Sequence, residues 1–224
     1  PWPGACGVYH PILTEAVVRF QSQAIMELFP ASGPVKTKII GEITDQKEEQ
    51  AQRIQQHMNY LLTEKMTEFR PETEQMLFSL ALAGSSFKKV YYDPSMGRVC
   101  SHFIPAEDFV VSYGASDLLT ASRYTHMMRK SHNDIRKLQV AGLYRDIELS
   151  PNAPDYSDIQ EKYDELEGEN PTYEHDDRYV LLEMHVDLDL EGYEDTDDDG
   201  DETGIALPYV VTMVKGGNSV LSIR

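Results

Sequence analysis

The fold is decided by a hairpin pattern in the last third of the chain, Tyr179-Val-Leu-Leu-Glu-Met-His-Val-Asp-Leu-Asp-Leu190 followed by Ile205-Ala-Leu-Pro-Tyr-Val-Val-Thr-Met-Val214. The first run alternates polar and apolar residues, and the second is rich in β-branched residues, as is typical of strands. An acidic tip, Glu194-Asp-Thr-Asp-Asp-Asp-Gly-Asp-Glu-Thr203, joins them. A Gly216-Gly217-Asn218 turn then leads into Val220-Leu-Ser-Ile-Arg224, which predicts a further strand.

Helical patterns precede these strands. Apolar residues at helical spacing predict helices over residues 11–29 and 45–66, and a third helix from Pro71 to a C-cap at Gly84. At the start of the second helix, we expect Asp45 and Glu48 to form a capping box.

Strand patterns then take over. The sequence predicts a hairpin over residues 87–104, strands near 109–113 and 123–128, and a helix from Ser131 to about Ala141. Helices followed by antiparallel strands with one inserted helix predict an α+β fold. We expect one α+β region over residues 1–224, helical over residues 1–86 and β-rich over residues 87–224. The β-rich region contains an acidic segment, 150–178, that we expect to be flexible.

Composition limits the classes of function. The 224 residues are 41% hydrophobic and 26% charged, which is typical of a globular domain, and the net charge is −18. This charge opposes a conventional nucleic-acid-binding surface, which needs clustered Lys and Arg. No apolar run has the length of a membrane span. The two cysteines, Cys6 and Cys100, are far apart and predict neither a disulfide framework nor a metal pair, so we expect a reducing compartment.

The acidic tip contains the weak metal candidates Asp195, Asp197 and Asp199. With Gly200, they match the first half of a calcium loop, in which carboxylates alternate and a glycine occupies the sixth position. The twelfth position, however, is Ala206 instead of a bidentate glutamate, and the flanks are strands instead of helices. We therefore favour a solvated hairpin tip over a specific calcium site.

A second metal candidate is the strand that enters this tip. Alternation places Glu183, His185, Asp187 and Asp189 on one face. We expect this face to be the wet side of a half-buried sheet, with Leu182, Met184, Val186 and Leu188 turned inward.

Catalytic and cofactor motifs are not found in the sequence. The seven histidines are scattered outside any HExxH pattern, and Cys100 has no nucleophile-elbow context. Neither GxGxxG nor a Walker loop occurs. We accordingly predict no catalytic residue, no cofactor and no enzymatic activity.

Several segments together carry a family resemblance through their order and spacing. They are Ala16–Leu28, Phe29-Pro-Ala-Ser-Gly-Pro-Val-Lys-Thr37, Glu49-Gln-Ala-Gln-Arg-Ile54, His57-Met-Asn-Tyr60, Gln75-Met-Leu77, Leu82-Ala-Gly-Ser85, Phe87-Lys-Lys-Val-Tyr-Tyr-Asp93, Pro105-Ala-Glu-Asp-Phe109, Pro208-Tyr-Val-Val-Thr212 and Val220-Leu-Ser-Ile-Arg224. In this order they resemble the portal proteins, or head-to-tail connectors, of short-tailed double-stranded DNA phages and related prophages. The resemblance extends over nearly the whole chain.

The resemblance implies a structural role without catalytic residues. The parent protein would be a dodecameric ring at one capsid vertex, through which terminase pumps DNA and from which DNA later leaves to the tail. Its partners would be further copies of itself, terminase, coat or scaffold protein, a tail adaptor and double-stranded DNA bound without sequence specificity. It would be found in the virion, and in the host cytoplasm during assembly. Membranes would not be involved.

The chain would then be an N-terminal piece that contains the wing region, since it begins at Pro1 without a methionine and stops inside a strand-like run. Two alternatives come from other classes of protein. One is a calcium-dependent binding module built on the acidic hairpin 195–202, and the other is a hydrolase that holds a metal with acidic residues. Both predict stability or activity that depends on a metal, whereas a portal predicts symmetric oligomers without turnover.

Overall fold

The computed structural model describes Gly4 and residues 10–94, 96–149, 178–197, 199–217 and 219–224. The fold is α+β, with helices and two antiparallel sheets. The chain forms two compact units, Pro1–Ala106 and Glu107–Arg224, which we call the helical unit and the sheet unit. The change from helices to strands near residue 87 does not coincide with the boundary between these units, because the hairpin over residues 87–104 packs with the helices. Apart from its last residue, the predicted flexible segment 150–178 lies outside the described residues.

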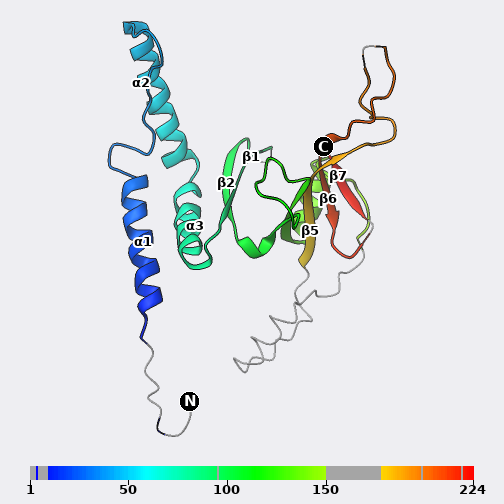
Figure 1. Cartoon of the computed structure of the whole chain (residues 1–224), viewed down its shortest axis with the longest axis horizontal. Helices are drawn as coiled ribbons and strands as arrows, with labels where there is room; N and C mark the ends of the chain where they lie inside the picture. The colour runs from blue at the N-terminus through cyan, green and yellow to red at the C-terminus, as the bar shows by residue number, and fades with distance from the viewer. Residues whose placement is uncertain (1–3, 5–9, 95, 150–177, 198, 218) are drawn as a thin grey trace. The chain divides into compact units, whose positions relative to one another are not determined.

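The helical unit is a row of packed elements, shown on the blue-to-green stretch of the ribbon in Figure 1. Helix α1 packs against α3, α3 packs against strand β2, and β2 pairs with β1, so that α1 and β1 end the row. Helix α2 continues through a π-helical turn, η1, into the segment before α3. The bounds are α1 Ile12–Leu28, α2 Asp45–Tyr60, η1 Leu61–Lys65, α3 Phe69–Ala83, β1 Phe87–Asp93 and β2 Arg98–Ile104.

The helix ends confirm Gly84 as a C-cap and correct two predicted starts: α3 begins at Phe69 instead of Pro71, and α2 is capped one residue earlier than predicted. Gly84 ends α3 at φ +78°, a left-handed conformation that glycine adopts without steric cost. At the start of α2, however, the N-cap is Thr44, whose side chain accepts a hydrogen bond from the Lys47 N–H at 3.4 Å. The predicted capping box at Asp45 was wrong by one position, because Thr44 has the extended backbone that an N-cap requires and Asp45 is already helical.

Two glutamates on α3 and the turn before it hold the hairpin to the helix. Glu72 accepts a hydrogen bond from the Phe103 N–H at 2.6 Å, and Glu68 accepts one from the Ser101 N–H at 3.4 Å. Four residues along a helix rise about 6 Å, close to the roughly 6.6 Å spanned by two residues of a strand. One turn of α3 therefore matches one side-chain repeat of β2. The carboxylates satisfy backbone donors along the outer edge of β2, which would otherwise be open to another strand.

Glu68 also makes stability depend on pH. Its pKa lies below the ordinary value of 4.5, mainly because the Arg98 guanidinium donates to the carboxylate at 2.7 Å, while burial opposes the shift. A carboxyl whose pKa falls on folding adds stability above its unfolded pKa, and this contribution is lost as the pH falls through the folded pKa. We expect Glu68→Gln to flatten the loss of stability between about pH 5 and pH 3 in urea unfolding. Equal slopes of the unfolding free energy against pH for the variant and the native chain would contradict this expectation.

The sheet unit is a five-stranded antiparallel sheet in the order β3-β4-β5-β6-β7, with helix α4 on one face. Ser131 caps α4 as predicted, since its hydroxyl accepts a hydrogen bond from the Asp134 N–H. The core joins Ile135 of α4 to Leu181, Val214 and Leu221 of the sheet. The bounds are η2 Ala106–Asp108, β3 Phe109–Val111, β4 Arg123–Ser131, α4 His132–Val140, β5 Arg178–Leu188, β6 Leu207–Val214 and β7 Val220–Ile223.

The structure corrects the predicted orientation of β5. Tyr179, Leu181 and Glu183 face the core and are buried, whereas Leu182, predicted to turn inward, is half-buried on the other face. The reason is that α4 and the segment after it cover the face that carries Leu181. Alternation along a strand identifies two faces but does not say which of them a distant segment covers.

Candidate functional site

The most unusual surface of the helical unit is the apolar surface of α1. Only Val17 of its 17 residues is buried. Large apolar side chains remain exposed on every side of the helix, namely Ile12, Leu13, Val18, Phe20, Met26 and Leu28. A helix with apolar side chains on every side normally lies inside a larger structure. Among the described elements of its own unit, however, the main neighbour of α1 is α3 (Figure 1).

The apolar face of α1 extends beyond the width that α3 covers. Val17 and Gln21 face α3, and the Gln21 side chain donates to the Glu74 carbonyl at 2.8 Å. At 100° per residue, Leu13 and Phe20 lie on one flank of this contact, and Val18 lies on the other. Leu13 is 62% exposed and Phe20 is 43% exposed. Among the described residues, both flanks therefore leave apolar surface exposed that a further packing partner could cover.

Helix α2 is held by hydrogen bonds instead of by a core. None of its 16 residues is buried. Asn59 accepts a hydrogen bond from the Val35 N–H at 2.9 Å and donates to the Val35 carbonyl at 3.2 Å, and Thr37 donates to the Ala51 carbonyl. Isolated helices of this length are marginal in water, and most helices gain their stability from packing. Exposed Ile54 and Met58 are consistent with a partner that is absent from the unit.

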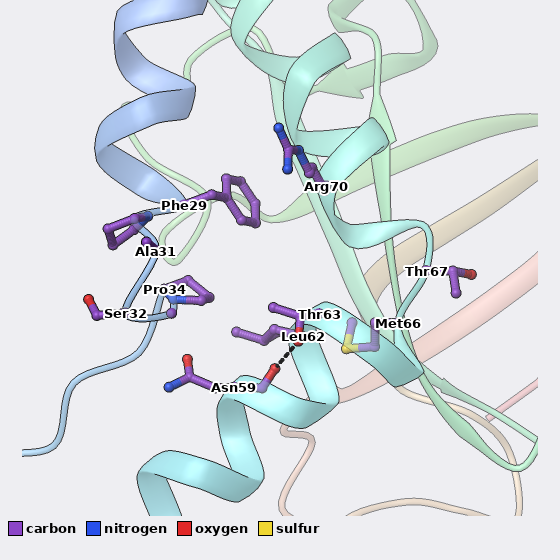
Figure 2. Close-up of a pocket in the computed structure, with 12 residues that line it drawn as sticks. Phe29, Ala31, Ser32, Pro34, Asn59, Leu62, Thr63, Met66, Thr67 and Arg70 are labelled. Atoms are coloured by element: carbon purple, nitrogen blue, oxygen red, sulfur yellow. Dashed lines mark hydrogen bonds between the residues drawn. The ribbon is translucent and has the colours of Figure 1, made fainter.

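A cavity of about 540 Å³ opens where the loop after α1 passes η1 and the start of α3 (Figure 2). Phe29, Pro34, Leu62 and Met66 supply apolar walls, and the Arg70 guanidinium lies 5.8 Å from the centre of the Phe29 ring. Three polar side chains of the wall already have partners within the chain: the Thr63 hydroxyl donates to the Asn59 carbonyl, the Asn59 amide is bonded to Val35, and Arg70 pairs with Glu74. These three groups are therefore not available to orient a small ligand.

Charge is distributed very unevenly between the two units. Residues 1–106 carry 10 basic and 11 acidic side chains, a net −1, whereas residues 107–224 carry 10 basic and 27 acidic side chains, a net −17. Two segments hold this excess: residues 150–177 carry 1 basic and 10 acidic side chains, and residues 187–203 carry 10 acidic and no basic ones. The surface of the helical unit can therefore approach another copy without strong net repulsion.

Two of the three metal candidates of the acidic tip, Asp195 and Asp197, use their carboxylates to hold the fold of the loop. One oxygen of Asp197 accepts hydrogen bonds from the N–H groups of Asp199 and Asp201, each at 3.0 Å. Asp195 accepts a hydrogen bond from the Thr203 hydroxyl at 2.7 Å. Among the residues that the structure describes, no group of three His, Cys, Asp or Glu side chains is placed to hold a metal ion. The arrangement is that of a closed hairpin tip.

The side chains of the second metal candidate, the face of β5 that begins at Glu183, do not converge on a common point either. Glu183 is only 5% exposed, and its carboxylate lies 3.7 Å from the His185 ring nitrogen and 3.8 Å from the Arg224 guanidinium. Asp187 and Asp189 are exposed, as predicted for the wet side of a sheet. The prediction was wrong for Glu183 because Tyr144, from the segment after α4, belongs to the core on that face.

Sequence reasoning missed the residues that surround Glu183. Register places His126, Glu183, Thr212 and Ser222 in one row across four strands. Burial raises the pKa of the Tyr144 hydroxyl, and the charge of Glu183 adds to the shift while Arg224 opposes it. Nothing in the spacing of these residues along the chain indicates the row, because it depends on strand register.

Two further residues with reactive side chains, Cys100 and Lys88, are packed against other parts of the fold. Cys100 is fully buried, and burial raises the pKa of its thiol, which disfavours the reactive thiolate. The Lys88 ammonium lies 4.1 Å from the centre of the Phe69 ring and donates to the Thr73 hydroxyl, and burial lowers its pKa. Cys6 and His175 lie outside the described residues.

Comparison with known proteins identified no relative: no protein-family model and no curated protein matches the chain. Among the described helices, none is both long enough and apolar enough to cross a membrane. The surfaces therefore have to be interpreted from their own chemistry. Uncovered apolar helices on a nearly neutral unit are typical of an interface between proteins.

Proposed function

We propose that this chain is the N-terminal, wing-containing portion of a portal protein of a short-tailed double-stranded DNA phage or prophage. The whole protein forms a homododecameric ring at one capsid vertex. Terminase drives DNA in through its channel, and the genome later leaves through the same channel to the tail. The role is structural. The protein belongs to the virion and assembles in the host cytoplasm with coat or scaffold protein and a tail adaptor.

The observation that carries this proposal is the ordered series of portal-like segments from Ala16–Leu28 to Val220-Leu-Ser-Ile-Arg224. The surfaces of the helical unit support its assembly aspect. A monomer gains little from a 16-residue helix without a buried residue, or from a helix that leaves six large apolar side chains exposed. Both features are expected where neighbouring subunits cover the helices.

The strongly acidic segments fit two roles in such a ring. Along a DNA path, negative side chains repel phosphates and prevent the duplex from sticking to the conduit. On the outside of the ring, the same side chains attract basic patches of coat protein. Of the two acidic segments, residues 187–203 are the one that the structure describes, apart from Asp198 at the tip.

Replacement of Asp197, Asp198 and Asp199 by Asn separates these roles. The substitution removes three negative charges at nearly constant volume. If the tip repels DNA, we expect less DNA per particle with unchanged ring assembly. If the tip recruits coat protein, we expect fewer portal-containing particles. Packaged DNA and portal content per purified particle are the measurements. Unchanged values for both would remove the tip from either role.

Electron microscopy of the proposed full-length protein tests the function itself. Class averages sorted by symmetry should show closed rings with a central channel, with twelve subunits as the dominant form. Monodisperse monomers or dimers would overturn the portal proposal. In that case, titration of calcium and magnesium against thermal stability would test the metal-dependent alternatives.

A further inference from the structure

The helical unit exposes a second apolar surface at the end of the row opposite to α1. On the hairpin, Val90 and Tyr92 of β1 share one face with Val99 of β2, because Val90 and Tyr92 are two residues apart and Tyr92 pairs with Val99. All three side chains are exposed. The order α1, α3, β2, β1 places α1 and the hairpin that carries this face at opposite ends of the row.

We propose that copies of this chain join head to tail, with α1 of one copy packed against the β1–β2 hairpin of the next. This inference rests on the ring in the proposed function, and it names the surfaces that form the contact. A heterologous contact uses two different patches of one subunit, and repetition of such a contact closes into a ring when the rotation allows it. One apolar end would be sufficient for a symmetric dimer, but the helical unit has two.

The areas are those of a small contact. At 100° per residue, four of the six exposed side chains of α1 lie on one side of the helix, namely Ile12, Leu13, Phe20 and Met26. At roughly 100 Å² of exposed apolar surface per large side chain, these four provide on the order of 400 Å², and the three on the hairpin about 300 Å². The total lies below the lower limit of specific interfaces, about 1,200 Å². A contact of this size is weak in a pair of subunits and gains strength when every subunit of a closed ring makes it twice.

The formal charges of the two ends are opposite in sign. Helix α1 carries Glu15, Glu27 and Arg19, a net −1, whereas residues 87–104 carry three basic side chains and one acidic side chain, a net +2. Two of these basic side chains already contact α3 or the turn before it, Lys88 at Thr73 and Arg98 at Glu68, so the attraction between the two ends is small. A basic protein or peptide would be drawn to the acidic segments of the sheet unit instead. A membrane surface is disfavoured as well, because helices that lie on membranes have polar faces rich in Lys and Arg, and α1 has a single Arg.

A groove beside the α1–α3 contact offers a concave surface into which a neighbouring copy can insert side chains. A cavity of about 460 Å³ is lined by residues of α1, α3 and β2, among them Gln21, Phe78 and Phe103. Phe78 and Leu82 of α3 are exposed and extend the apolar surface beyond α1. Side chains of a neighbouring copy can therefore insert between the two helices as well as cover their outer sides.

The test mixes two variants of the whole chain, each with one defective end. The first variant, Leu13→Glu with Phe20→Glu, places charges on α1. The second variant, Val90→Glu with Tyr92→Glu, places charges on the hairpin. All four positions are exposed, so we expect circular dichroism spectra and melting temperatures close to those of the native chain. The matched control, Tyr113→Glu with Leu119→Glu, adds the same charge at exposed positions of the sheet unit.

Sedimentation velocity at about 100 µM should show oligomers for the native chain and the control, and monomers for each variant alone. An equimolar mixture of the two variants should form 1:1 heterodimers, because each variant retains the end that the other has lost. A monomeric native chain would overturn the proposal, and so would a monomeric mixture. If the native chain is monomeric and the α1 variant melts at a lower temperature, the sheet unit of the same chain covers α1 instead.

The outcome is distinguishable from that of the portal proposal. Closed rings of the full-length protein that persist in both variants would leave the portal function standing and overturn the head-to-tail contact. Complementation between the variants, together with open or non-ring oligomers of the full-length protein, would support the head-to-tail contact and overturn the portal function.

Discussion

Leu181→Ala is expected to lower the free energy of unfolding by about 3 kcal/mol, within the usual range of roughly 2–5 kcal/mol for a leucine truncated in a core. Leu181 is 0% exposed and packs with Ile135, Tyr179 and Leu221 beneath α4. Truncation removes apolar burial and leaves a cavity that α4 and the sheet cannot fully close. Urea unfolding followed by circular dichroism measures the change.

The adjacent residue provides a matched control. Leu182→Ala deletes the same atoms one position along β5, but from the face that α4 does not cover, where Leu182 is only half-buried. We expect a loss of about 1 kcal/mol, because less surface returns to water and the site can relax. A loss for Leu182→Ala that equals or exceeds that for Leu181→Ala would restore the sequence-based orientation of β5 and refute the observed one.

Glu72→Ala is expected to lower the free energy of unfolding by about 1.5–3 kcal/mol, the range for a hydrogen bond to a charged group. The variant leaves the Phe103 N–H without its acceptor at 2.6 Å and frees the outer edge of β2. It also removes the contact of 3.3 Å between the carboxylate and the His102 ring. We therefore expect unfolding at lower urea concentration and faster hydrogen exchange at the Phe103 amide.

Glu74 supplies the control on the same helix. Its carboxylate pairs with Arg70 at 3.1 Å, but both side chains are largely exposed to solvent. Exposed pairs at this spacing contribute roughly 0.3–0.5 kcal/mol. Glu74→Ala should therefore leave the hairpin in place, with native exchange at the Phe103 amide. Equal destabilisation by the two variants would show that the acidity of α3, and not the docking of β2, is responsible.

The elements of the fold were predictable from local patterns, whereas their partners were not. Strand alternation indicated β5 and β6, and Gly84 and Ser131 marked helix boundaries where the structure has them. Local signals suffice at these positions because turns and caps depend on a few adjacent residues. The error at Asp45 arose between two neighbouring residues that can both cap a helix.

The candidate sites depended on contacts between distant segments of the chain. Glu183 was assigned to the solvent face because its neighbours alternate, but Tyr144, nearly forty residues earlier, covers it. The docking of Glu68 and Glu72 on β2 likewise requires a helix and a strand about thirty residues apart to lie side by side. Hydrophobic periodicity carries no information about which faces meet, so these sites could not be derived from it.

The uneven distribution of charge divides this chain into a block that favours association and a block that opposes it. A nearly neutral block of 106 residues with uncovered apolar side chains is joined to a block of net −17. In such molecules the apolar surface of the neutral block favours growth of an assembly, whereas repulsion between the charged blocks limits the size of the assembly. Salt shifts this limit, because the screening length shortens from about 10 Å at 0.1 M to about 3 Å at 1 M ionic strength. If copies associate through the helical unit as proposed, we expect low salt to favour small closed assemblies and high salt to favour larger ones.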